Sequence, residues 1–576
     1  MDILEKYKSI TVNELSRSFP NHDLSNISFE FPRDSSNGDF STNAALVLFK
    51  KLKIETRDVY NLIFNLFKDN DDFESIELAK NGFINFTVKD HVLHNLIRDV
   101  LVNKSSFGKK NIGNSEKIII EYVSANPTGP LHVGHTRGAV FGDTLSNILD
   151  FVGYSVCREY YINDSGEQIK NLAKSVYLRY KQNFSDKKIS IPEDLYPGEY
   201  LIPIAKKISE NYHDHFLDKE EKVWLEVFKE EAINSVMDII KKDLDDLGIK
   251  HDVFTSENSL LKSGYVDKTF SSLKKKNLLY EGKTQPPKGS KKNDWVQENH
   301  ILFKSKKFGD DEDRVIRKHD GQWTYFMPDI AYHFNKFEGG FSKMVNIFGA
   351  DHSGYIARMK AAVKAITNDK ANLEIKTCQL VRLSRAGKPV KMSKRSGSFI
   401  TLNELIEEVG KDAVRFMMVS RKNDAQLDFD FEIFKNENND NPIFYIQYAN
   451  ARINSLIRNS KDKLGIKIKE KDLIKSDLNL LKNINERKII FQIANFPRVI
   501  EQSAIFMEPH RLSYYLRDLA SVFHQYWNLK VNDKRIQILD KKEIDLSMAR
   551  VALLFSVSIT IQIGLSLLGI KAIEEL

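Results

Sequence analysis

The segment "IIIEYVSANPTGPLHVGHTRGAVFGD", residues 118–143, is the most informative part of this 576-residue sequence. Its run of isoleucines, Ile118 to Ile120, is typical of a parallel strand that is buried on both faces. After a loop rich in Asn, Pro and Gly, apolar residues recur with the spacing of one helical face: Phe141, Leu145, Ile148, Leu149 and Val152. Strand, loop and helix in this order predict an α/β domain built on a parallel sheet.

Two histidines, His132 and His135, lie where the loop enters the expected helix. As a zinc site the pair is poor, because no cysteine or acidic third ligand is nearby. Open α/β sheets bind ligands at this edge, and a helix N-terminus presents N–H groups and partial positive charge to a phosphate. Gly134 would let a nucleotide approach the backbone. The residues favour a nucleotide site, with ordinary polar histidines as the alternative.

A second segment, "AGKPVKMSKRSGSFITLNELIEE" (386–408), combines lysines with glycine and serine. Lys388, Lys391 and Lys394 would be able to close on the β- and γ-phosphates of a nucleotide as charge builds there. The pattern Thr401-x-x-Glu404 predicts a capping box that begins a helix. A solvated basic loop without a ligand is the alternative interpretation.

Composition indicates a globular protein of several domains. Hydrophobic residues make up 41% and charged residues 29% of the chain, and the net charge of +7 permits a polyanionic partner without requiring one. Only Cys157 and Cys378 are present, which favours a reducing compartment and argues against a zinc knuckle or a disulfide framework. No secretory signal begins the chain. The apolar stretch 551–570 has the length of a membrane span, but its Ser, Thr and Gln residues favour a buried helix.

The pattern along the chain predicts three domains. Residues 1–108 would form a small α+β domain, with a strand, a turn at Asn37-Gly38-Asp39, a helix from about Ser41 and a second strand over 81–88. Residues 109–440 would form the parallel-sheet domain, with strands over 343–352 and 374–383 and an insertion at about 165–320. Residues 441–576 carry long helical patterns without strands and predict a helical domain.

The two motifs form a pair that resembles a known family. HVGH and KMSKR are similar to the HIGH and KMSKS signatures of class I aminoacyl-tRNA synthetases, in the same order around a Rossmann-like domain. Val133 replaces Ile in the first signature. Arg395 stands at the last position of the second signature, in a loop expected over 388–398. The resemblance implies an ATP site.

The flanking sequence resembles bacterial-type arginyl-tRNA synthetase along almost the whole chain. The similar segments include "EYVSANPTGPLHVGHTRGAVFGD", "REYYINDSGEQI", "TYFMPDIAYHFNKF", "GADHSGYIARMKA" and "GLSLLGIKA". The resemblance implies an arginine–tRNA ligase that forms arginyl-adenylate from L-arginine and ATP and transfers the arginyl group to the 3′ end of tRNA(Arg). It also implies an anticodon-binding role for the helical domain and contact of the N-terminal domain with the tRNA elbow.

The resemblance assigns roles to individual residues. Catalytic roles fall on His132, His135, Lys391 and Lys394. ATP-binding positions are His132, Gly134, His135, Gly349, Asp351, His352, Met392 and Lys394. The arginine pocket maps onto Glu121, Asn126, Tyr325 and Asp329, where carboxylates suit the planar fork of a guanidinium. Without the resemblance, Glu121 would be interpreted as a charged residue at the end of a strand. Tyr325 and Asp329 would be interpreted as residues at the start of a helix.

In the helical domain, Tyr448 and Arg452 would share one helix face and bind tRNA by stacking and charge; a buried Tyr448 is the alternative. We expect Mg²⁺ only with ATP, no structural metal, no DNA or membrane partner, a monomer and a cytoplasmic location. The alternatives are another class I synthetase, a small nucleotidyltransferase with an H-x-G-H turn, and a non-catalytic tRNA-binding paralogue.

Overall fold

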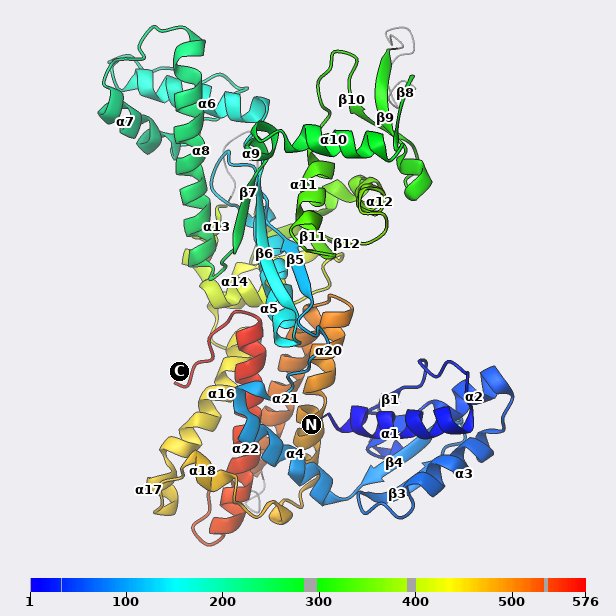
Figure 1. Ribbon diagram of the computed structural model, residues 1–576. Helices are drawn as coiled ribbons and strands as arrows, with labels where there is room; N and C mark the ends of the chain where they lie inside the picture. Colours follow the sequence, from blue (N-terminus) through cyan, green and yellow to red (C-terminus); the bar gives the residue numbers. More distant parts are fainter. Residues whose placement is uncertain (1, 33, 284–297, 391–399, 533–536, 576) are drawn as a thin grey trace. The chain divides into compact units, whose positions relative to one another are not determined.

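A computed structural model describes residues 2–32, 34–283, 298–390, 400–532 and 537–575 (Figure 1). They pack into two compact units. The first unit comprises Met1–Lys110, Glu437–Met507 and Arg511–Leu576. The second comprises Asn111–Asn436 and Glu508–His510.

A five-stranded parallel sheet lies at the centre of the second unit, in the order β12-β11-β5-β6-β7. The sequence-based prediction of a parallel sheet at residues 118–120 is therefore confirmed. The strands are β5 (Lys117–Glu121), β6 (Ser155–Ile162), β7 (Val253–Ser256), β11 (Lys343–Gly349) and β12 (Asn372–Cys378).

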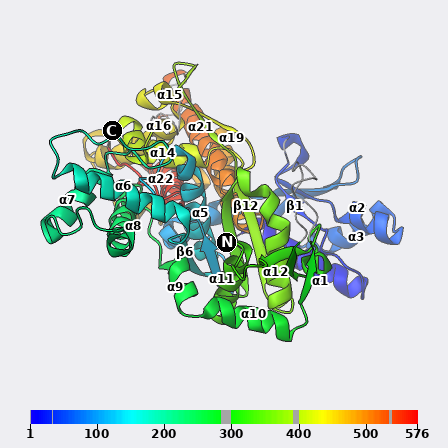
Figure 2. The ribbon, with the colours of Figure 1, turned by 90° about the horizontal axis from the view of Figure 1, so that it is seen from above.

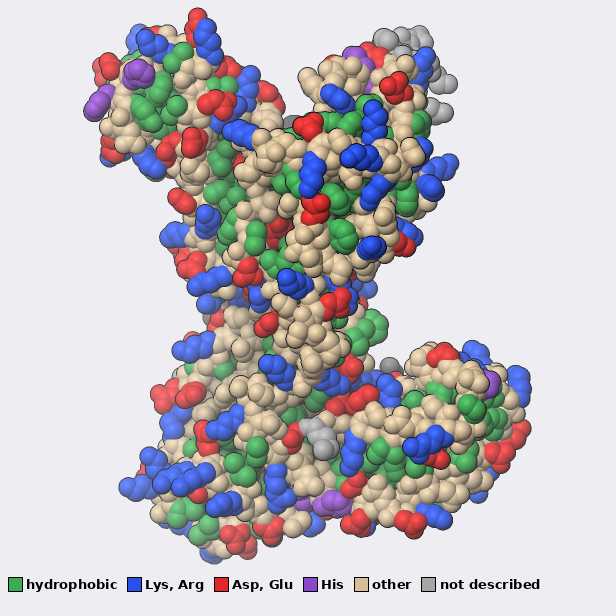
Figure 3. All heavy atoms as spheres, viewed as in Figure 1, with side chains coloured by type: hydrophobic (Ala, Val, Ile, Leu, Met, Phe, Trp, Pro, Cys, Tyr) green, Lys and Arg blue, Asp and Glu red, His purple; other side chains and the backbone are tan. Residues whose placement is uncertain are grey.

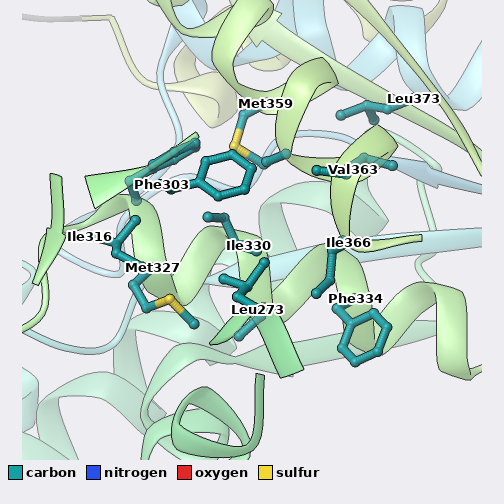
Figure 4. Packing of buried hydrophobic residues seen from close by; sticks show 14 of the residues in the cluster. Leu273, Phe303, Ile316, Met327, Ile330, Phe334, Met359, Val363, Ile366 and Leu373 are labelled. Carbon is teal, nitrogen blue, oxygen red and sulfur yellow. The ribbon is translucent and has the colours of Figure 1, made fainter. Parts of the chain in front are cut away.

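Helices cover this sheet because its strands are apolar on both faces. On one face, Ile119 of β5 and Met344 of β11 pack against α11 (Phe326–Glu338) and α12 (Ile356–Ile366). Figure 4 shows part of this cluster, in which Ile330 and Phe334 of α11 lie among Met359, Val363 and Ile366 of α12. The helix after β5 is α5 (Val133–Phe151), and its predicted apolar face is buried.

The stretch 165–320, expected as an insertion, contributes to the sheet through β7, which pairs in parallel with β6. In Figures 1 and 2 its first three helices lie toward the β7 side of the unit, and α12 and β12 lie on the other side. Its elements are α6 (Glu167–Gln182), α7 (Leu201–Tyr212), α8 (Glu221–Asp246), α9 (Glu257–Lys262), α10 (Tyr265–Lys275), β8 (Leu279–Lys283), β9 (Asn299–Phe303) and β10 (Arg314–Arg317). The last three strands form an antiparallel sheet.

The single strand expected over 374–383 is wrong, because two strands of different sheets occupy this stretch. β12 ends at Cys378, and β13 (Val381–Arg385) pairs in parallel with β15 (Leu427–Asp430) outside the central sheet. Leu380 between them is 71% exposed, so the apolar run is interrupted by an exposed irregular segment and is not one continuous buried strand. The remaining elements here are β14 (Lys388–Pro389), α13 (Leu402–Val409), α14 (Lys411–Met418) and α15 (Phe431–Lys435).

The first unit contains the expected α+β fold near its N-terminus. The antiparallel sheet has the order β1-β2-β4-β3. Its elements are α1 (Ile3–Ser18), β1 (Phe29–Glu30), β2 (Phe40–Thr42), α2 (Ala44–Leu52), α3 (Thr56–Phe67), β3 (Phe73–Leu78) and β4 (Ile84–Val88). The helix expected from Ser41 begins later, at Ala44, because Ser41 is paired within β2.

The remaining described elements of the first unit are helical, as predicted. They are α4 (Asp90–Asn103), α16 (Pro442–Arg458), α17 (Ser460–Leu464), α18 (Glu470–Leu473), α19 (Ile484–Ala494), α20 (Phe496–Ile505), α21 (His510–Asn532) and α22 (Ile544–Leu567). In the described residues only α22 is long and apolar enough to span a membrane, and 89% of its apolar window is buried within the protein. Its hydroxyls are satisfied internally: Ser556 donates to the Ala552 carbonyl at 3.0 Å and Ser558 to Asn450 Oδ1 at 2.6 Å. The prediction of a buried helix is confirmed.

Acidic and basic side chains are interspersed on the face that Figure 3 shows. The net charge of +7 therefore does not gather into one basic patch on that face.

Candidate active site

The loop between β5 and α5 is held in place by three contacts at the carboxyl edge of the sheet. The Tyr160 hydroxyl donates to the Ala125 carbonyl at 2.7 Å, and the Leu131 N–H donates to Asp243 Oδ2 at 2.9 Å. The Tyr200 hydroxyl donates to the Thr128 carbonyl. These contacts come from β6, α8 and the residue that precedes α7, so the loop conformation depends on distant parts of the second unit.

Two consecutive residues of this loop have a left-handed backbone. Val123 has φ of 70° and Ser124 has φ of 39°, which is unusual for residues with a β-carbon and rare for a β-branched one. Such strain costs about 1–3 kcal/mol per residue and is concentrated at functional sites. It places the Ser124 hydroxyl 3.2 Å from Glu121 Oε1, to which it donates. Ser124 Oγ in turn accepts from the Tyr161 N–H at 3.1 Å.

The two histidines of the HVGH segment form a cap at the start of α5. Nδ1 of His132 accepts from the Gly134 N–H at 3.1 Å, and Nδ1 of His135 accepts from the His132 N–H at 3.4 Å. The rings lie with centroids 3.9 Å apart. Because both Nδ1 atoms accept, each neutral ring carries its proton on Nε2 and is a donor at that atom.

Gly134 is required by the first of these rings. A β-carbon at this position would lie 2.8 Å from Cε1 of His132, closer than side chains normally approach. Glycine therefore allows the His132 ring to fold back over the first turn of the helix.

The two sequence motifs meet through backbone hydrogen bonds. The Leu402 N–H donates to the Leu131 carbonyl at 2.8 Å, and the Val133 N–H donates to the Ile400 carbonyl at 3.3 Å. The predicted capping box at the start of α13 is confirmed, since Thr401 and Glu404 exchange side-chain and backbone hydrogen bonds. The described Lys388 is exposed in β14. Lys391, Met392, Lys394 and Arg395 lie outside the described residues.

Two of the predicted arginine-binding residues are carboxylates, one at the end of a sheet strand and one in a helix. Glu121 is buried at the last position of β5. Asp329, in the first turn of α11, accepts a hydrogen bond from the Tyr355 hydroxyl. Desolvation raises the pKa of Asp329 to about 7, and the nearby charge of Glu121 adds to this effect.

The other two predicted pocket residues lie in more open surroundings. Tyr325 immediately precedes α11 and is 81% exposed. The half-buried Asn126 donates from Nδ2 to Gln168 Oε1 at 2.6 Å.

The predicted ATP-binding residues after β11 lie at the same edge of the sheet as the His132 segment. Gly349 ends β11, and Asp351 and His352 follow in a 3₁₀ turn (Ala350–Tyr355). Both side chains are exposed, and His352 Nε2 lies 3.6 Å from Asp351 Oδ2.

Several buried polar residues of α11, on the same helix face as Asp329, were not predicted from the sequence. Tyr332, His333 and Lys336 are buried and follow Asp329 at intervals of one helical face. That spacing in "DIAYHFNK" was the available signal, because four polar or aromatic residues on one face of a core helix need partners.

In the helical part of the first unit, Tyr448 and Arg452 lie on one face of α16, as predicted. The Arg452 guanidinium lies 4.0 Å from the Tyr448 ring centre and donates to its hydroxyl at 2.6 Å. Trp527 of α21 adds a second ring, 5.3 Å from the same guanidinium. Tyr448 is only half-buried, so it is not an ordinary core residue.

Family models match three consecutive parts of the chain. The N-terminal domain of arginyl-tRNA synthetase matches residues 5–88, the catalytic domain of class I (R) tRNA synthetases matches 96–459, and the DALR anticodon-binding domain matches 446–576.

Individual proteins are similar over nearly the whole length. An arginine–tRNA ligase of Parvibaculum lavamentivorans is 45% identical, and one of Bartonella henselae is 46% identical, each over 96% of this chain and 95% of the relative. The arginyl-tRNA synthetase of Thermus thermophilus has the same fold, with a TM-score of 0.74 and 19% identity over 100% of both chains.

The parallel sheet, its HVGH helix start and the matching catalytic domain define a class I aminoacyl-tRNA synthetase. Within that class, the chain belongs to the arginyl-tRNA synthetase family. The alternatives of another class I synthetase, a nucleotidyltransferase or a non-catalytic paralogue are not favoured.

Proposed function

We propose that this protein activates L-arginine with ATP at the carboxyl edge of its parallel sheet and transfers the arginyl group to the 3′ end of tRNA(Arg). Family membership carries the activity, which is that of an arginine–tRNA ligase, EC 6.1.1.19. One observation supports the location above all: buried Glu121 ends the strand whose following loop leads to the paired rings of His132 and His135.

In the first step, a carboxylate oxygen of arginine bonds to the α-phosphorus of ATP, and the bond to the bridging oxygen breaks to release pyrophosphate. His132 and His135 would donate from Nε2 to the α-phosphate oxygens as negative charge develops there. Their Nδ1 hydrogen bonds hold both rings in the donor tautomer before ATP arrives, so little reorganisation is needed. No general base is required, because the attacking carboxylate is already ionised.

The leaving pyrophosphate would be stabilised by Lys391 and Lys394, with Met392 beside the nucleotide. The backbone pairing of Ile400 and Leu402 with the His132 segment supports this role, because the chain leaving the lysine segment returns directly to the other motif. Gly134, Gly349, Asp351 and His352 would complete the ATP site. Mg²⁺ would accompany the phosphates of ATP and neutralise part of their charge.

The guanidinium of arginine would bind to Glu121 and Asp329, with Asn126 and Tyr325 closing the pocket. Two carboxylates on different elements suit the divergent N–H groups of a guanidinium. A lysine ammonium would leave some acceptors unpaired, which accounts for discrimination without an editing domain. The strained Val123–Ser124 pair supports this assignment because it directs a hydroxyl donor to Glu121.

In the second step, the ribose hydroxyl at the tRNA 3′ end attacks the arginyl carbonyl and displaces AMP. The stacked Tyr448 and Arg452 would contact anticodon-loop bases, and the N-terminal domain would contact the tRNA elbow. We propose that the protein acts as a monomer in the cytoplasm.

Arginine-dependent ATP–pyrophosphate exchange tests the proposal, measured with and without tRNA and with lysine and cysteine as control amino acids. Of the three amino acids, we expect only arginine to support exchange. The rate of this exchange should rise when tRNA is added. Exchange that survives replacement of both His132 and His135 by Ala at the wild-type rate would contradict the assignment of the site.

A further inference from the structure

Lys336 of α11 is a buried lysine at the base of the proposed arginine pocket. A buried ammonium is unfavourable unless it is paired and hydrogen-bonded. Here its pairing is complete enough that the pKa of Lys336 is raised rather than lowered, because Glu121 and Glu159 outweigh the effect of burial.

The partners of Lys336 come from three adjacent strands. In the parallel register Glu121 of β5 lies opposite Glu159 of β6 on one side and Asn346 of β11 on the other. All three side chains therefore project from the same face of the sheet, toward α11. Nζ of Lys336 lies 2.7 Å from Glu121 Oε2, 3.2 Å from Glu159 Oε2 and 3.5 Å from Asn346 Oδ1.

The same contacts connect Glu121 to the backbone of Asp329, the second acidic residue of the proposed pocket. Nδ1 of His333 lies 2.8 Å from the Asp329 carbonyl oxygen, so Nδ1 must donate. Nε2 of His333 then accepts from Asn346 Nδ2 at 2.9 Å, which turns Asn346 Oδ1 toward Lys336. A continuous buried network thus joins the backbone of Asp329 to the side chain of Glu121.

Each carboxylate has a further donor that restricts its rotation. Glu121 Oε1 accepts from Ser124, as described above, and Glu159 Oε1 accepts from the Thr255 hydroxyl at 2.6 Å. The Lys336 ammonium also lies 4.1 Å from the Tyr332 ring centre.

We propose that Lys336 is a specificity-determining positioning residue for arginine: it neutralises one of the two neighbouring glutamates and holds Glu121 in the orientation that receives the guanidinium. The two glutamates and Lys336 together carry a single negative charge, which lies beside Asp329, the other carboxylate proposed to bind the guanidinium. Without the ammonium, the adjacent carboxylates would repel each other, and one would take up a proton. This inference rests on the proposed role of Glu121 in binding arginine.

Substitutions that alter the charge count test the proposal through the KM values for arginine and ATP and through kcat of pyrophosphate exchange. Lys336→Met is expected to raise KM for arginine by about 30-fold or more, as expected when one partner of a buried charge pair is removed, with kcat changed less. Adding Glu159→Gln to Lys336→Met restores the single negative charge of this cluster. The double variant is expected to have a KM for arginine about tenfold lower than that of Lys336→Met. KM for ATP should change less than about threefold in both variants.

Lys343→Met is the matched control, because Lys343 pairs with Glu116 at 2.7 Å near the opposite end of β11 and should leave KM for arginine unchanged. A double variant no better than Lys336→Met would overturn the charge-balancing role. So would an unchanged KM in Lys336→Met. Circular dichroism and thermal unfolding establish folding of each variant.

If Lys336→Met does not fold, Glu159→Gln alone supplies the test. It leaves one carboxylate against one ammonium, and KM for arginine should rise by about tenfold; an unchanged KM would overturn the inference. Glu121→Gln distinguishes failure of the proposed pocket from failure of the role of Lys336 alone. If Glu121→Gln has no effect on KM for arginine, the proposed pocket fails; if it raises KM while Lys336→Met does not, only the role of Lys336 fails.

Discussion

The Leu131 carbonyl accepts a hydrogen bond from the Leu402 N–H at 2.8 Å, so the residues on either side of the two sequence motifs are neighbours in space. This contact places the start of α13, with its Thr401 cap, directly beside His132. The chain that leaves the lysine-rich motif therefore has one end anchored at the other motif.

Loss of the Thr401 N-cap at the start of α13 should affect catalysis more than stability. Thr401→Ala removes an N-cap and should cost about 1 kcal/mol of stability, while kcat of pyrophosphate exchange falls. Asn441→Ala, which removes the N-cap of α16, is the control. For this variant we expect a similar fall in melting temperature and an unchanged rate of pyrophosphate exchange. Equal exchange rates in the two variants would argue against a catalytic role for the anchor.

Arginine binding should depend on pH through Asp329. Its pKa of about 7 means that the carboxyl is largely protonated below neutral pH. The guanidinium favours the ionised form, so affinity for arginine should increase as pH rises toward about 7 and then level off, with a proton released on binding at lower pH. Calorimetric titration in buffers of different ionisation enthalpy measures that proton. Asp329→Asn should abolish the slope; a slope that persists would assign it to another group.

Glycines of α5 offer a matched pair of substitutions. Gly134→Ala brings a β-carbon to 2.8 Å from the His132 ring and should displace it, lowering kcat of exchange by about 10- to 100-fold. Gly138→Ala places its β-carbon 3.9 Å from Ile347, an ordinary contact, and should preserve activity while stabilising the helix by up to about 1 kcal/mol. Equal activities in the two variants would show that the ring position is unimportant.

Two buried tyrosines near the active-site loop should respond oppositely to loss of their hydroxyls. The Tyr160 hydroxyl holds the Ala125 carbonyl, so Tyr160→Phe should destabilise the protein by about 1 kcal/mol. The buried Tyr122 hydroxyl has no hydrogen-bond partner within the described residues, so Tyr122→Phe should be neutral or stabilising. Denaturant unfolding measures both. A larger loss for Tyr122→Phe than for Tyr160→Phe would contradict this comparison.

Arg452 should contribute to tRNA binding without taking part in chemistry. Arg452→Ala removes the cation stacked on Tyr448 and should raise KM for tRNA by about tenfold, with aminoacylation kcat at saturating tRNA unchanged. Arg458→Ala on the same helix is the control, because Arg458 pairs with Glu575 and the Glu574 carbonyl. If both variants leave KM for tRNA unchanged, the contact surface lies elsewhere.

The elements that sequence predicted well are those specified by local pattern. The isoleucine run and the apolar face after it give β5 and α5, and the Thr401–Glu404 spacing gives a capping box. The error at residues 374–383 has the same origin. An apolar run indicates strands, but the exposed break at Leu380 between two different sheets leaves no periodic signal.

Sequence by itself therefore determined the parallel-sheet class, the helical C-terminal part and the two motifs, because each depends on residues close together in the chain. Only the tertiary structure decided that Lys336 pairs with Glu121 and Glu159, that desolvation raises the pKa of Asp329, and that Leu131 pairs with Leu402. These properties arise from charges and backbone groups that are distant in sequence, and their energies depend on separations and burial that exist only after the chain has folded.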